Sequence, residues 1–362
     1  MRVMVIYIVL LFLVYIFGVV FLQIIHNRKY FLFFSFASMA TVLGLRSSSV
    51  GEDTQHFLKI FDISKSISWG TIFSGVTETT WSIQWGIDQK IENGYMTLNK
   101  VLHIFTDKGQ WLLIVMAILT CWLVARFIYK NIPEHVFLAT QIFLCESLYM
   151  NSFNLMRQIL AISIGINAYS CIKDKKYIRA LFIFLSAFMF HKSSLVLLIM
   201  IPLCLVKNNQ KMIKYALISG FSISILMPKI ASVISMLIPR YSSYFNVNYW
   251  QANINGTIIL WVIEIGICLF MYIKKVKNKD TFMGVTCTIL YLTFEIIGFN
   301  LSIFSRIALY FRVFLMILFS SFVNYISPKK RILYYILILL LITVAYMSYA
   351  SSDARVYTFF WQ

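Results

Sequence analysis

The stretch that decides the fold is residues 180–206, ALFIFLSAFMFHKSSLVLLIMIPLCLV, an apolar run of 27 residues with a polar centre. A basic loop flanks each of its ends, and short basic loops stay on the cytoplasmic side of a membrane. The run must therefore enter and leave the membrane from the same side. Two helices of about 12 residues reach only ~18 Å each, whereas the hydrocarbon core is roughly 30 Å thick.

These lengths predict a short, broken helical hairpin that turns within the membrane at His191-Lys192-Ser193-Ser194. Irregular backbone at that depth must line protein or a water-filled cavity. We therefore expect an aqueous cavity to reach His191. One long span is the alternative, and it would reverse the orientation of every later segment.

The composition is that of a polytopic membrane protein, because 60% of the 362 residues are hydrophobic and 13% are charged. Soluble domains contain about 45–50% apolar residues, and a membrane span needs about 20 of them in a row. We predict an all-α fold with about 12 passes in a single integral membrane domain, residues 1–362. The predicted spans are residues 3–25, 30–46, 111–130, 136–151, 158–172, 180–190, 194–206, 215–238, 257–273, 281–299, 307–325 and 332–350.

The formal net charge of +18 reports topology, because the basic residues gather in the short loops between predicted spans. Nucleic acid is therefore not expected as a partner. The six cysteines lie inside apolar runs, without the CxxC or Cys/His spacing of a metal site. We expect no metal and no cofactor. Walker, dinucleotide-binding, HExxH and GxSxG motifs are also absent from the sequence.

Residues 47–110 form the one long loop between predicted spans, and they contain seven acids and no run long enough to span. The spacing of Phe57, Ile60, Tyr95 and Leu98 predicts short amphipathic helices. Because both termini are expected outside, this loop is extracytoplasmic. Inside the spans, acids are rare, and Arg312 is the candidate partner of Glu146, Glu264 and Glu295.

Arginines at the outer ends of spans contravene the bias of basic residues toward the cytoplasm. Arg46, Arg157 and Arg306 form this set, and Arg240 is a weaker member. A guanidinium binds phosphate oxygens in bidentate fashion, so the set predicts a site for a lipid diphosphate. Snorkelling to lipid phosphates, or pairing with outer acids, is the alternative.

Three further polar residues share the predicted outer face and can act as acid, base or hydroxyl acceptor. They are Asp53, Glu92 and His191. An attack by a sugar hydroxyl needs such a group, and histidine has the better unperturbed pKa for a base. Each is also a plausible structural residue on its own. Tyr95, Trp85 and Trp250 are candidates for sugar contact, since flat aromatic faces suit sugar rings and Trp is skewed to the outer side.

These residues resemble the EpsG family of bacterial membrane proteins, relatives in role of the Wzy polysaccharide polymerases. The resemblance spans roughly residues 44–311, and one departure is Phe57, where the family has Tyr more often. The matching elements, in chain order, are Arg46 with Val50-Gly51-Glu52-Asp53-Thr54 and Phe57; Glu92-Asn93-Gly94-Tyr95; Asn154-Leu155-Met156-Arg157-Gln158; Phe190-His191-Lys192-Ser193-Ser194; and Arg306 with Tyr310-Phe311.

The resemblance implies a metal-independent glycosyltransferase that polymerises undecaprenyl-diphosphate-linked oligosaccharide repeats for O-antigen, capsule or exopolysaccharide. It places the active site at the outer face of the bacterial plasma membrane. Gln158 joins Arg46, Arg157 and Arg306 as an expected diphosphate contact. Membrane lipid is an expected partner, and a chain-length regulator and a flippase are candidate ones.

Two rival functions remain at this point. A glycan ligase would use the same cationic site on a different acceptor. A flippase or antiporter of lipid-linked sugar would show functional groups on both faces and an internal repeat. The sequence shows no repeat, and its candidate residues gather on one predicted face, which favours the enzyme. A purely structural partner would leave an intramembrane His191 unexplained.

Overall fold

The computed structural model describes residues 4–74, 91–206, 209–237, 254–275, 277–298, 302–351 and 356–362. Over these residues the chain is helical without strands, which confirms the predicted class, and a lone β-bridge joins Arg46 to Phe359. The chain forms two compact units, which we describe separately. The first contains residues 1–136, 149–197 and 347–362, and the second contains residues 137–148 and 198–346.

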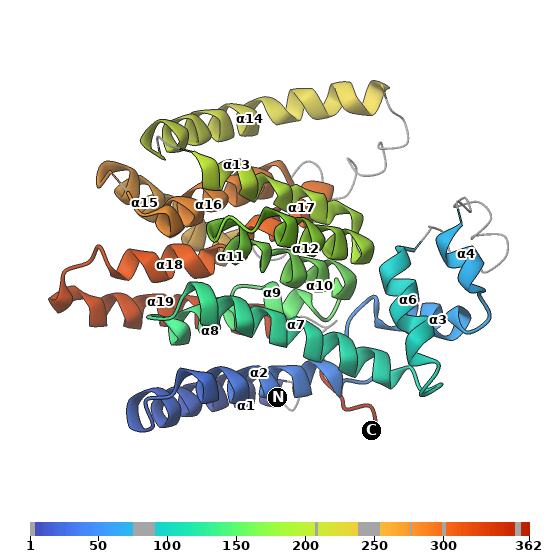
Figure 1. The fold of residues 1–362 in the computed structure, drawn as a ribbon. Coiled ribbons are helices and arrows are strands. Elements are labelled where there is room, and N and C mark those ends of the chain that lie inside the picture. Colours follow the sequence, from blue (N-terminus) through green and yellow to red (C-terminus); the bar gives the residue numbers. More distant parts are fainter. Residues whose placement is uncertain are drawn as a thin grey trace. The chain divides into compact units, whose positions relative to one another are not determined.

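In the first unit, α7 packs against α2 on one side and α10 on another. Figure 1 shows α2 and α7 lying alongside one another. Asn27 starts α2 by accepting hydrogen bonds from the backbone of Lys29 and Tyr30, which meets two orphan donors of the first turn. The helices are α1 (Val5–Phe17), the π-helix η2 (Gly18–Ile24), α2 (Arg28–Gly44), α3 (Thr54–Ser64), α4 (Trp69–Phe73), α6 (Asn93–Leu102), α7 (Gln110–Asn131), α9 (Leu148–Asn151), α10 (Met156–Gly165), α11 (Ala168–Lys173), α12 (Tyr177–Phe190) and the 3-10 helix η3 (Lys192–Ile199).

In the second unit, α16 is the central helix and packs against α14, α17 and α18. Gly284 permits this, because a Cβ there would lie 2.9 Å from the backbone nitrogen of Leu318. Arg312 pairs with Glu146 at 2.9 Å, so the pairing expected from the sequence is confirmed. The helices are α8 (Val136–Cys145), α13 (Met200–Leu205), α14 (Asn209–Leu237), α15 (Ile254–Ile273), α16 (Lys279–Gly298), α17 (Ser302–Arg312), α18 (Leu315–Val323) and α19 (Pro328–Ala350).

Among the described residues, five helices are long and apolar enough to cross a membrane. They are Val5–Ile24, Gln110–Asn131, Lys279–Gly298, Ile303–Val323 and Pro328–Ala350. Several predicted spans are interrupted: 136–151 breaks at Glu146 and Ser147, and 158–172 breaks after Gly165. Ser147 has a φ of 59°, and both it and Glu146 are buried, as irregular backbone must be at membrane depth. The total of about 12 passes stays a prediction.

The predicted break at His191 is present. Helix α12 ends at Phe190, His191 is extended, and η3 begins at Lys192. A Cβ on Gly165 of α10 would lie 3.6 Å from the side chain of Ala187 and 2.4 Å from that of Leu197. Segments on both sides of His191 therefore pack against the same point of α10. The depth of this turn in a membrane stays a prediction.

The segment 47–110 contains short helices, as predicted. Helices α3 and α6 each bury one face against the first turn of α7, and Phe57, Ile60 and Tyr95 join Leu112 and Leu113 in one apolar core. In Figure 1, α3, α4 and α6 form a group beside the start of α7. This small helical body holds the first half of the candidate site.

Candidate functional site

A carboxylate, an arginine and a histidine from three separate elements meet in the first unit. Arg157, in the first turn of α10, donates from Nη1 to Glu92 Oε2. His191 Nδ1 lies 3.2 Å from the other oxygen, Glu92 Oε1, at ion-pair distance but without hydrogen-bond alignment. The exposed fractions of the three side chains are 10% for Glu92, 12% for Arg157 and 24% for His191. The cluster is thus sheltered, with His191 the most open to solvent.

Gly94 brings the carboxylate to the histidine. Glu92 precedes α6, and Gly94 in its first turn lies against the end of α12. A Cβ on Gly94 would lie 2.7 Å from both Cβ and the carbonyl oxygen of Met189, which is closer than any real contact. Met189 is two residues before His191, so this close approach of backbones sets the distance between Glu92 and His191.

Two aromatic rings hold the guanidinium of Arg157. Its Cζ lies 5.8 Å from the ring centre of Phe57 and 5.6 Å from that of Tyr95. The two rings pack edge to face at 6.2 Å. Such cation–π contacts fix the plane of the guanidinium and shield it from water. Phe57 thus contributes through its ring, and this contact requires no hydroxyl at that position.

The ionisation of Glu92 follows from these neighbours. Burial pushes the pKa of its carboxyl upward, but the approach of His191 and the charge of Arg157 outweigh that effect. The net pKa lies below its ordinary value, so Glu92 is an anion at neutral pH. It can therefore orient and stabilise cationic partners but cannot donate a proton.

Asp53 lies one helical turn before Phe57, the residue whose ring contacts Arg157. It precedes α3, and its carbonyl accepts the backbone N–H of Phe57 at 3.0 Å, so the two residues are one helical turn apart. Residues four apart share a helix face. The Asp53 side chain makes no capping hydrogen bond and is partly exposed. It therefore remains a candidate acceptor for a substrate hydroxyl.

The turn around Gly51 docks on the turn that leads into α10. Gly51 has a φ of 91°, and a Cβ there would lie 2.5 Å from the carbonyl oxygen of Phe153. The backbone N–H of Glu52 donates to Asn154 Oδ1 at 3.1 Å. Two of the motifs recognised in the sequence therefore contact one another directly, through a position that favours glycine.

Arg46 is completely buried behind this turn. Its Nη1 donates to the carbonyl of Leu43 at 2.5 Å, and its Cζ lies 5.3 Å from the ring centre of Phe153. Within the described part of the chain, no carboxylate lies at ion-pair distance from it. A buried cation without an anionic partner is costly, and an oxyanion is the ligand that such a group accepts best.

The remaining candidates are distributed as follows. Arg306 is an exposed residue of α17 and belongs to the second unit, so its proximity to Arg157 stays a prediction. Gln158 is buried beside Arg157 on α10. Tyr95 is fully buried against Phe57 and Arg157, and its contact with a sugar stays a prediction. Trp85 and Trp250 lie outside the described residues.

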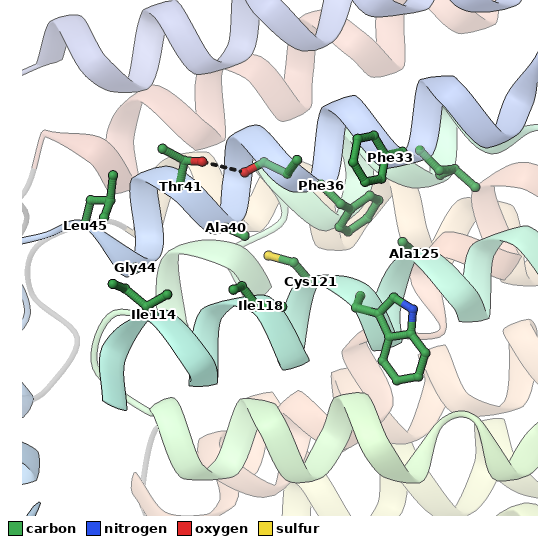
Figure 2. A pocket seen from close by; sticks show the side chains of 13 residues that line it. Phe33, Phe36, Ala40, Thr41, Gly44, Leu45, Ile114, Ile118, Cys121 and Ala125 are labelled. Atoms are coloured by element: carbon green, nitrogen blue, oxygen red, sulfur yellow. Dashed lines mark hydrogen bonds between the residues drawn. The ribbon is translucent and has the colours of Figure 1, made fainter. Parts of the chain in front are cut away.

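An apolar groove of about 450 Å³ lies between α2 and α7. Figure 2 shows Phe33 and Phe36 on one side, with Ile114 and Ile118 opposite. The groove is also lined by Thr41, whose hydroxyl donates its hydrogen to the carbonyl of Ala37 at 2.9 Å. A hydrocarbon chain is the ligand that this lining suits. Among the described residues there is no cluster of three or more His, Cys, Asp or Glu suited to a metal ion.

The helices and this cluster define an all-helical membrane protein with an arginine, carboxylate and histidine site. The chain belongs to the EpsG family, which it matches over residues 29–362. The resemblance seen in the sequence is therefore confirmed over nearly the whole chain. Membership implies a polysaccharide polymerase-like role with glycosyltransferase-like chemistry. No curated protein and no solved structure matches the chain.

The role of Gly94 can be tested by Gly94→Ala. The added methyl must displace the end of α12, because its contacts are with Cβ and with the carbonyl group of Met189, none of which can rotate away. We expect activity to fall about tenfold or more, as for a misplaced catalytic group, while the protein still folds. Gly266→Ala is the matched control, since nothing lies within 4 Å of a Cβ there. Equal activity of the two variants would contradict the proposed role of Gly94.

Proposed function

We propose that this protein polymerises undecaprenyl-diphosphate-linked oligosaccharide repeats at the outer face of a bacterial plasma membrane, for O-antigen, capsule or exopolysaccharide. The observation that carries the proposal is the Glu92, Arg157 and His191 cluster, which combines a phosphate-binding group with a base. Membership of the EpsG family supports it independently.

Arg157 is suited to hold the diphosphate of the growing chain. It lies in the first turn of α10, where the helix dipole favours an anion. Phe57 and Tyr95 keep its planar guanidinium oriented, as bidentate binding requires. We assign Arg46 and Gln158 to the same ligand, and the apolar groove between α2 and α7 to its hydrocarbon chain.

His191 is suited to act as the general base. Nδ1 lies 3.2 Å from Glu92 Oε1, so a proton carried on Nδ1 sits beside the carboxylate and leaves Nε2 as the acceptor. A carboxylate placed in this way orients an imidazole and stabilises its protonated form, as in other carboxylate–histidine pairs. Glu92 is then a positioning residue that serves both Arg157 and His191. Asp53 is the alternative acceptor for the attacking hydroxyl.

The reaction then proceeds in one displacement. The hydroxyl oxygen of the incoming repeat forms a bond to the anomeric carbon of the growing chain, and the bond from that carbon to the diphosphate oxygen breaks. The hydroxyl proton passes to His191 Nε2, and undecaprenyl diphosphate leaves with the bonding electron pair. Arg157 stabilises the charge that develops on the diphosphate, which is the kind of effect that usually dominates catalysis.

Surface glycan from a strain that lacks the gene tests this function. Loss of a polymerase should leave single repeats on the surface acceptor, and the wild-type gene should restore long chains. A ligase would instead leave the acceptor bare, because the same cationic site would act on the finished glycan. A flippase would trap precursor inside the cell. Either of those two results would reject the polymerase.

A further inference from the structure

The guanidinium of Arg46 has hydrogen-bonding capacity that its surroundings do not use. Nη1 makes a short bond to Leu43, but Nη2 lies 3.5 Å from the carbonyl of Phe153, at the limit of a hydrogen bond. Nε has no hydrogen-bond partner, although the whole side chain is buried. A buried arginine with unmet donors is suited to binding an oxyanion, since phosphate oxygens accept several such donors at once.

Residues 356–362, here named the C-terminal strap, lie directly over the segment that carries Arg46. The strap runs antiparallel to residues 45–47, and Phe359 pairs with Arg46 itself. Ser47 N–H donates to the carbonyl of Thr358 at 2.9 Å, and Phe360 N–H donates to that of Leu45 at 3.0 Å. This end of the chain lies near the end of α2 (Figure 1).

Side chains complete the attachment of the strap. Tyr357 donates from its hydroxyl to the carbonyl of Val42 at 2.9 Å, and its ring packs edge to face on Tyr7. The hydroxyls of Ser47 and Thr358 are 2.6 Å apart. The guanidinium of Arg46 therefore lies against Phe153, while the backbone of the same residue is paired with the strap.

The attachment is slight for a segment that buries a charge. Its backbone part is a two-stranded pairing with few hydrogen bonds, an arrangement that is marginally stable when isolated, and the side-chain contacts of Tyr357 and Thr358 add to it. The side chains of Phe360 and Trp361 beyond the pairing remain 48% and 60% exposed. Displacement of the strap would break these bonds and the ring contact with Tyr7, whereas the packing of α2 on α7 and of α7 on α10 does not involve the strap.

We propose that the strap is a movable cover on an oxyanion site at Arg46. The strap is paired with the Arg46 segment as seen here, and its displacement admits the diphosphate of the lipid-linked sugar to Arg46. This proposal rests on the proposed function for the identity of the ligand. It also explains how a fully buried arginine can serve a substrate that arrives from the membrane.

A reversible disulfide between strap and segment tests the proposal. In a variant with the native cysteines replaced, Ser47→Cys and Thr358→Cys place two sulfurs where oxygens now lie 2.6 Å apart, against about 2.04 Å for a disulfide. Phenylglyoxal modification of Arg46, read by mass spectrometry, reports access to the guanidinium. We expect modification and chain growth to be lost on oxidation and restored by a reductant.

Protection experiments on the reduced protein identify the ligand. Inorganic diphosphate, and vesicles that contain undecaprenyl diphosphate, should each protect Arg46 from phenylglyoxal, with the lipid form effective at the lower concentration. Protection by the inorganic form alone would overturn the assignment to the lipid. Absence of any protection would overturn the oxyanion site.

The single variants Ser47→Cys and Thr358→Cys, treated with the same oxidant, serve as matched controls. Each should retain chain growth and the modification of Arg46 by phenylglyoxal. If the oxidised double variant also retains chain growth and the modification of Arg46, the strap does not need to move and the proposal fails. If wild-type protein makes no polymer while modification of Arg46 still follows the disulfide, the cover stands and the proposed function falls. The two failures are therefore distinguishable.

Discussion

Replacing Arg157 with lysine is expected to abolish most chain growth although the positive charge is retained. A lysine ammonium is a compact point charge, and it cannot make the paired hydrogen bonds that a guanidinium makes with a diphosphate. It also cannot stack in the same way between Phe57 and Tyr95, whose ring centres lie 5.8 and 5.6 Å from Arg157 Cζ. Loss of one such donor to a developing charge costs about 10²–10³ in rate.

The measurement is the rate of polymer formation from purified lipid-linked repeats, at matched protein levels. Arg179→Lys is the control, because Arg179 is exposed on α12 and the same chemical change there should be silent. Thermal unfolding separates a damaged fold from a damaged site. Normal polymer length and rate in Arg157→Lys would exclude direct contact between Arg157 and the diphosphate.

Replacing His191 with alanine is expected to leave binding of the lipid-linked precursor intact and to stop chain growth. The substitution retains the last backbone hydrogen bond of α12, from the N–H of residue 191 to the carbonyl of Ala187 at 3.0 Å. Removal of a general base typically costs about 10²–10⁴ in rate. Glu92 keeps its bond to Arg157 in this variant, so the diphosphate side of the site is preserved.

Two readouts distinguish a base from a structural residue. Precursor binding should match that of wild-type protein, and added imidazole should restore part of the chain growth. His56→Ala is the control, because His56 is exposed on α3. A variant that loses binding and growth together, without rescue, would show that His191 shapes the site instead of acting as its base. Asp53 would then be the remaining candidate acceptor.

Local and one-dimensional properties of the sequence determined several parts of this protein. Apolar runs and basic loops predicted an all-helical membrane protein. The preference of a segment for water or for lipid depends on its own side chains and can therefore be read along the chain. The break at His191 followed from helix rise and membrane thickness, and the Glu146 and Arg312 pair followed from the scarcity of charges in the apolar runs. The family motifs also named Arg157 and Glu92 as members of one set.

The tertiary structure alone decided how those residues meet. That Glu92 lies between Arg157 and His191 depends on the close approach at Gly94, and no local pattern predicts which backbone a glycine will face. The pairing of the Arg46 segment with residues 356–362 joins positions about 310 residues apart in the chain. Such pairings arise from the packing of whole helices. The path of the backbone determines which side chains meet at a site, and residues adjacent in sequence do not.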